Sequence, residues 1–67
     1  MNGQPILYVD QWGNRWLVRT VRELHKRIGG GHLSKMFRDK ADGDTVHCGY
    51  VVGQHWCTAY RPIELPA

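Results

Sequence analysis

The stretch "HCGYVVGQHWC", residues 47–57, decides how the C-terminal half of this chain folds. Its Gly53-Gln54 step places glycine at the first central position of a two-residue turn, which is the type II′ pattern. The residues on either side are rich in β-branched and aromatic side chains, as strands are. The stretch therefore predicts an antiparallel hairpin with strands over Thr45–Val52 and His55–Arg61.

The register of this hairpin follows from the position of its turn. Tyr50 is expected opposite Cys57, and Cys48 opposite Ala59. One predicted face, the more apolar one, carries Cys48, Tyr50, Val52, His55, Cys57 and Ala59. The other predicted face carries His47, Gly49, Val51, Trp56, Thr58 and Tyr60. We expect the first face to belong to the core and the second to offer its aromatic rings to a partner.

The first face also raises the question of a metal site. Cys48, His55 and Cys57 are candidate zinc ligands, and His32 or His25 is available as a fourth. However, the chain contains no Cys-x-x-Cys or His-x-x-x-His pair, and apolar side chains lie among the candidates. A disulfide between the two cysteines is disfavoured, because diagonal partners in a regular ladder lie near the limit of Cα separation. We expect free thiols, no metal and no other cofactor.

A second hairpin is predicted by "QPILYVDQWGNRWLVRT", residues 4–20. Two β-rich runs, Ile6–Asp10 and Arg15–Thr20, flank the loop Gln11–Asn14, whose glycine and asparagine tolerate positive φ. A four-residue loop gathers one set of apolar side chains on the core face: Leu7, Val9, Trp16 and Val18. The opposite face mixes apolar and charged side chains, so we expect something to cover part of it.

A short helix is predicted after this hairpin. Thr20 and Glu23 have the spacing of a capping box, and apolar residues recur at helical spacing over Val21–Ile28. Gly29 fits a left-handed C-terminal cap. The following "GGGH", residues 29–32, lacks the Lys-Ser/Thr of a phosphate-binding loop, so it is interpreted as a connector.

The remaining segment completes the predicted fold. Leu33–Lys40 is expected to form a strand, because the turn signal "ADGD" at 41–44 joins it to the next one. The result is a single small α+β domain over residues 1–67, of order ββαβββ, with an antiparallel curled sheet or partial barrel and one helix. No motif identifies a family, although the size and layout resemble small proteins encoded by phages and mobile elements.

Composition restricts the class of protein. The 67 residues carry nine Lys and Arg against six Asp and Glu, a net charge of +3, with no long run of one sign. This excludes an acidic DNA mimic and favours anionic partners only weakly. No membrane span or signal peptide is evident, so we expect a cytoplasmic protein. A homodimer stays open, since domains this small often gain stability from self-association.

Catalysis is not expected. The chain has no serine-centred elbow, paired-carboxylate motif or dinucleotide fingerprint, and its directly adjacent His47 and Cys48 point to opposite sides of a strand. We predict a small binding protein, an adaptor or inhibitor that docks on a larger protein through aromatic and basic residues. The alternative is a nucleic-acid-binding module that stacks bases and neutralises phosphates. The candidate contact residues are Trp12, Arg15, Arg19, Lys26, Arg27, Trp56 and Tyr60.

Overall fold

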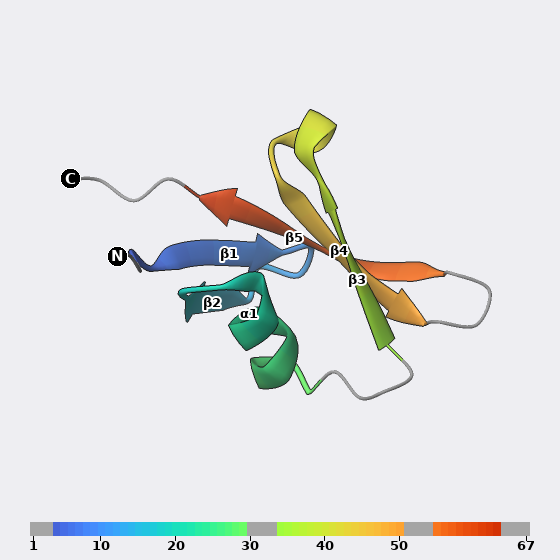
Figure 1. Ribbon diagram of the computed structural model, residues 1–67, viewed down its shortest axis with the longest axis horizontal. Coiled ribbons are helices and arrows are strands. Elements are labelled where there is room, and N and C mark those ends of the chain that lie inside the picture. Colours follow the sequence, from blue (N-terminus) through green and yellow to red (C-terminus); the bar gives the residue numbers. More distant parts are fainter. Residues whose placement is uncertain (1–3, 30–33, 51–54, 64–67) are drawn as a thin grey trace.

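The computed structural model describes residues 4–29, 34–50 and 55–63 (Figure 1). Its elements are β1 (Ile6–Asp10), β2 (Arg15–Val18), α1 (Val21–Arg27), β3 (Ser34–Asp39), the short 3₁₀ helix η1 (Lys40–Asp42), β4 (Thr45–Tyr50) and β5 (Trp56–Ile63). The strands form one antiparallel sheet in the order β2-β1-β5-β4-β3. The sheet curls without closing, which confirms the predicted α+β class and the order ββαβββ.

The register of the first hairpin differs from the predicted one by one residue. Val9 lies opposite Arg15, and Tyr8 lies opposite Trp16. The loop is one residue shorter than expected, because the Asp10 backbone N–H donates to the Asn14 carbonyl oxygen at 3.0 Å. Gly13 takes the left-handed φ of 86° that this turn requires. A shift of one residue exchanges the two faces of one strand relative to the other. Trp16 and Val18 of β2 pack in the core as predicted, but their partners on β1 are Tyr8 and Ile6. The prediction that Leu7 and Val9 face the core is therefore wrong.

The second hairpin is shifted as well. Cys48 lies opposite Thr58 rather than Ala59, and a bulge between Cys48 and Gly49 brings Gly49 opposite Trp56. The backbone carbonyl of His55 lies so close to Gly49 that a β-carbon at this position would collide with it. Glycine therefore permits the close approach of the β4 and β5 backbones at the bulge. The predicted Gly53-Gln54 turn lies outside the described residues.

The helix begins as predicted. The Thr20 hydroxyl accepts a hydrogen bond from the Glu23 backbone N–H at 3.0 Å, while the Glu23 carboxylate accepts one from the Arg19 N–H at 2.8 Å. The helix ends at Arg27, whose guanidinium donates to the Leu17 carbonyl oxygen at 2.8 Å. This bond fastens the end of α1 to the edge strand β2.

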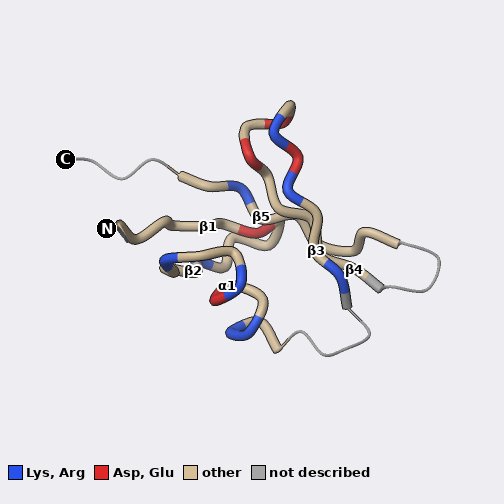
Figure 2. The backbone as a smooth tube through the Cα atoms, in the orientation of Figure 1, with Lys and Arg blue, Asp and Glu red and all other residues tan. Residues whose placement is uncertain are grey.

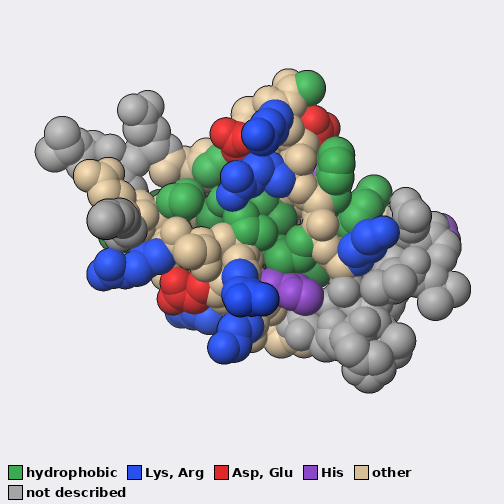
Figure 3. Space-filling model, in the orientation of Figure 1, with side chains coloured by type: hydrophobic (Ala, Val, Ile, Leu, Met, Phe, Trp, Pro, Cys, Tyr) green, Lys and Arg blue, Asp and Glu red, His purple; other side chains and the backbone are tan. Residues whose placement is uncertain are grey.

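The core lies between α1 and one face of the sheet, here called the inner face. Its buried apolar residues are Tyr8, Val18, Leu24, Val46 and Tyr60. The Trp16 and Tyr60 rings meet edge to face, with centroids 6.5 Å apart. In Figure 3, apolar side chains occupy the centre of the view, and lysine and arginine side chains surround them. No helix in the described part of the chain is long and apolar enough to cross a membrane.

Candidate binding surface

The tip of the β1–β2 hairpin is organised by one buried carboxylate. Asp10 accepts hydrogen bonds from the backbone N–H groups of Trp12 (3.0 Å) and Asn14 (2.8 Å), and from the Asn14 side-chain amide (3.0 Å). A carboxylate that accepts several N–H groups replaces the water it loses on burial. Asp10 thus fixes the conformation of the loop that carries Trp12.

These contacts also determine the ionisation of Asp10. Burial by itself would raise the pKa of Asp10, but the hydrogen bonds from Asn14 and Trp12 outweigh it, and the pKa lies below its ordinary value of 3.8. The buried Trp16 indole N–H forms no regular hydrogen bond among the described residues, yet it favours the ionised form of Asp10. The carboxylate is therefore charged at neutral pH.

Gln11 ties the same tip to the other half of the sheet. Its side-chain amide donates to the Cys57 carbonyl oxygen at 3.1 Å and accepts from the Ala59 N–H at 2.8 Å. One side chain thereby imitates the pairing of a neighbouring strand along β5. Because these partners lie 46 and 48 residues away in sequence, the sequence pattern gives no signal for this contact.

Trp12, which directly follows Asp10 and Gln11, is the most exposed large apolar side chain described, at 67%. Its backbone is held by Asp10, and the adjacent Gln11 is held by β5. A rigid loop loses little conformational entropy when its side chain enters a partner's pocket. The predicted exposure of Trp12 is confirmed, and the structure adds the restraint.

A second group of exposed rings lies on the outer face of the sheet, the face turned away from the core. The Phe37 ring lies 6.3 Å from His47 and 6.0 Å from Trp56 between centroids. Phe37 is 48% exposed and Trp56 40%. These three residues, here called the aromatic cluster, come from three adjacent strands, β3, β4 and β5. Sequence reasoning missed Phe37, because "LSKMFRDK" shows no clean alternation.

The outer face carries a further apolar group near the chain termini. Leu7 lies opposite both Leu17 and Ile63, so the three side chains form one row across β2, β1 and β5. Leu17 is 50% exposed and Ile63 45%. The neighbouring row places Val9 between Arg15 and Arg61. Two arginines therefore separate this apolar row from the aromatic cluster.

The basic candidates lie apart from the aromatic cluster. Lys26 and Arg27 belong to α1, Arg19 precedes it, and Arg15 is on β2. In Figure 2 the basic residues of α1 lie well away from the β3–β4 turn, which contains several acidic residues. Arg27 already serves a structural purpose at Leu17, and Arg19 has contacts of its own. Of these four candidates, only Arg15 lies on the outer face of the sheet. The cation next to the aromatic cluster is instead Lys35, two residues before Phe37 on the same face of β3.

Tyr60 is not part of the exposed surface. It lies on the inner face opposite Val46 and Asp10 and is buried. Burial raises the pKa of Tyr60, nearby Cys48 and Asp10 raise it further, and a hydrogen bond with the Thr58 side chain acts in the opposite direction. The expectation that Tyr60 shares an exposed face with Trp56 is wrong, because the bulge at Gly49 separates their faces.

Among the described residues, the zinc candidates Cys48, His55 and Cys57 form no group of three close ligand atoms, and His32 lies outside these residues. Cys48 is half-buried and Cys57 is exposed, both as free thiols, and the Cys57 Sγ approaches the His55 carbonyl oxygen at 3.8 Å. Within the described ranges, the one set of three ligand side chains with mutually close ligand atoms is Asp39, Asp42 and His47, all within 4.8 Å. Sequence reasoning did not identify this set.

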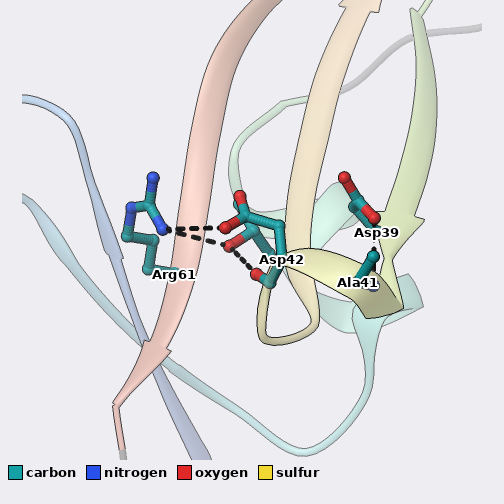
Figure 4. A network of polar contacts seen from close by, with 5 residues as sticks. Asp39, Ala41, Asp42 and Arg61 are labelled. Atoms are coloured by element: carbon teal, nitrogen blue, oxygen red, sulfur yellow. Dashed lines mark hydrogen bonds and ion pairs between the residues drawn. The ribbon is translucent and has the colours of Figure 1, made fainter.

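Figure 4 shows why this set is already engaged. Asp42 faces the Arg61 guanidinium, with Oδ1 and Nη1 3.6 Å apart, and Asp39 accepts a hydrogen bond from the Ala41 N–H at 3.1 Å. Arg61 also approaches the Thr45 hydroxyl, which donates to the Asp42 carbonyl oxygen. The cluster thus holds the β3–β4 turn against β5, and its negative charge lies next to the ring of His47.

No protein-family model matches this chain, and no curated protein or solved structure shows significant similarity to it. The function is therefore inferred from the surface alone.

Proposed function

We propose that this chain is a small binding protein, an adaptor or inhibitor, that docks on a larger protein through Trp12 and the aromatic cluster. The observation that carries the proposal is that the most exposed aromatic side chain lies on a loop fixed by the side chains of Asp10 and Gln11. Rigid, exposed tryptophans are typical anchors of protein interfaces.

The aromatic cluster supports a second contact region. Phe37 and Trp56 expose large apolar surfaces on one face, and the Gln11 amide holds the Trp12 loop beside β5, the strand that begins at Trp56. Two large exposed apolar side chains on one face, together with a third exposed on a loop held beside β5, form the kind of surface that marks an interaction site. We therefore place the centre of the proposed interface on β5.

Nucleic acid is the less favoured partner. Stacked bases bring phosphates close to the rings, which calls for cations among the aromatic side chains. Lys35 supplies one cation on this face of β3, but on the other side of Phe37 the ligand atoms of Asp39, Asp42 and His47 lie within 4.8 Å of one another. These carboxylates would repel a phosphate backbone, whereas a protein partner can meet them with its own basic side chains.

The test is affinity capture with the full chain, followed by titration of the captured protein. We expect one partner at fixed stoichiometry, and Trp12→Ala to weaken its binding by about 100-fold or more, as at an interface hot spot. The matched control is Leu17→Ala, which also truncates an exposed apolar side chain but lies in the apolar row. Equal effects of the two variants would contradict the proposal.

An oligonucleotide titration at two salt concentrations tests the alternative directly. Phosphate contacts produce binding that weakens steeply as salt rises. Salt-sensitive oligonucleotide binding that is lost in Trp56→Ala would replace the protein-binding proposal with the nucleic-acid one.

A further inference from the structure

β3 is an open edge of the sheet. In the described part of the chain it pairs with β4 alone, and nothing pairs with its other side. The opposite edge, β2, differs because the Arg27 guanidinium donates a hydrogen bond to its Leu17 carbonyl oxygen. An open edge exposes backbone N–H and C=O groups that can pair with another strand.

The sequence of β3 is self-complementary about Phe37. Lys35 and Asp39 stand two residues before and after Phe37 and share its face of the strand. If two β3 strands pair antiparallel with Phe37 at the twofold axis, each Lys35 lies opposite Asp39 of the second copy. The two phenylalanines then face each other, and Met36 lies opposite Arg38 of the second copy.

We infer that this chain associates with a second copy of itself through β3, in antiparallel register centred on Phe37, to form one continuous sheet across the twofold axis. The inference goes beyond the proposed function and does not depend on Trp12 or on any other protein.

The charges of β3 support a second copy of the chain as its partner. Lys35 is exposed and has no ion pair among the described residues, and neither has Asp39. Asp39 uses one carboxylate oxygen to accept from Ala41 and lies close to Asp42, whose own cation is Arg61. Lys35 of the second copy would supply the cation that Asp39 lacks among the described residues of its own chain. The symmetry provides this ion pair twice.

The aromatic cluster supports the same register. Phe37 is 48% exposed although it contacts His47 and Trp56 on its own sheet. Pairing across the axis would cover the edge of this ring with its counterpart and join the two clusters. Aromatic pairs directly opposite each other stabilise antiparallel strands.

Arg38 opposes the association. In this register the two Arg38 side chains are diagonal neighbours across the axis, where like charges repel. We therefore expect a weak dimer, and Arg38→Gln should tighten it. Removal of the positive charge at Lys35 should weaken the dimer. Loss of a cation from β3 therefore changes the dimer affinity in opposite directions at the two positions.

The main experiment is sedimentation equilibrium of the full chain from about 10 μM to about 1 mM, a range that brackets a weak dimer. We expect a concentration-dependent dimer that Lys35→Glu weakens by about 10-fold or more, because this change places a second carboxylate opposite Asp39. The control is Lys26→Glu, which makes the same charge change on α1. A monomer throughout the range, or equal effects of both variants, would overturn the inference.

A complementary pair of variants tests the register. Asp39→Lys alone should be monomeric, because two lysines then face each other. Mixed with Lys35→Glu, it should form a heterodimer, since every opposed pair is then of opposite charge. If circular dichroism shows that Asp39→Lys is unfolded, Asp39→Asn replaces it, because asparagine can still cap η1 and should weaken the homodimer.

Amide hydrogen exchange gives an independent readout. Protection of β3 amides should rise with protein concentration in the native chain and stay constant in Lys35→Glu. A concentration-dependent rise confined to any other strand would place the interface elsewhere and refute the assignment to β3.

Discussion

Asn14 donates two hydrogen bonds to the carboxylate of Asp10, from the backbone N–H at 2.8 Å and from the side-chain amide at 3.0 Å. This double contact closes the hairpin one residue earlier than its composition suggests, and it turns Tyr8, instead of Leu7 and Val9, into the core opposite Trp16. A polar contact at the turn thus determines which apolar side chains are buried.

The first prediction concerns acid stability. Because the pKa of Asp10 is lower in the folded chain than its ordinary value of 3.8, ionised Asp10 stabilises the fold above that value. This contribution should disappear as the pH falls through the folded-state pKa. In urea unfolding measured from about pH 6 to about pH 2, the free energy of unfolding should fall less in Asp10→Asn than in the native chain. The matched control is Asp44→Asn, the same isosteric change in an exposed turn.

The second prediction concerns Gln11. Gln11→Ala removes both hydrogen bonds to β5 and should lower the free energy of unfolding by about 1–2 kcal/mol. The anisotropy of Trp12 fluorescence should also fall, measured in a background where Trp16 and Trp56 are phenylalanine. Gln4→Ala, at an exposed position ahead of β1, is the matched control. Unchanged anisotropy would mean that Trp12 is not held by this contact.

A feature of this fold is predictable from sequence when the residues that determine it lie close together in the chain. The helix was predictable because its start depends on Thr20 and Glu23, which are three residues apart. Most strand positions were predictable from local composition. The faces were not, because a side-chain contact in the first hairpin and a bulge at Gly49 in the second each shifted the register by one residue.

The candidate surface also combines features set by nearby residues with features set by residues distant in sequence. Trp12 could be identified from its place in a turn, and its exposure is a local property. The restraint by Gln11 and the grouping of Phe37 with Trp56 depend on strands that meet only in the folded sheet. Tyr60 was misassigned because its face depends on the bulge rather than on its neighbours in sequence.

The third prediction concerns that bulge. Gly49→Ala places a β-carbon against the backbone of His55, whose carbonyl carbon would lie 2.6 Å away. Backbone atoms cannot move aside as a flexible side chain can, so we expect a loss of about 3 kcal/mol or more, measured by urea unfolding. Ala59→Gly, opposite His47 on the neighbouring strand, tests the general cost of flexibility in the hairpin. A cost for Gly49→Ala below that of Ala59→Gly would contradict the close approach.

The fourth prediction uses the two thiols, which lie in different environments. Burial raises the pKa of Cys48, and the nearby Cys57 raises it further, so little of Cys48 is thiolate at neutral pH. Cys57 is exposed. Iodoacetamide should therefore modify Cys57 first and Cys48 several-fold more slowly, as followed by intact mass and peptide mapping. In Cys57→Ser the neighbouring thiol is gone but the burial remains, so Cys48 should react only slightly faster. Faster modification of Cys48 than of Cys57 in the native chain would show that the inner face of β4 is open to solvent.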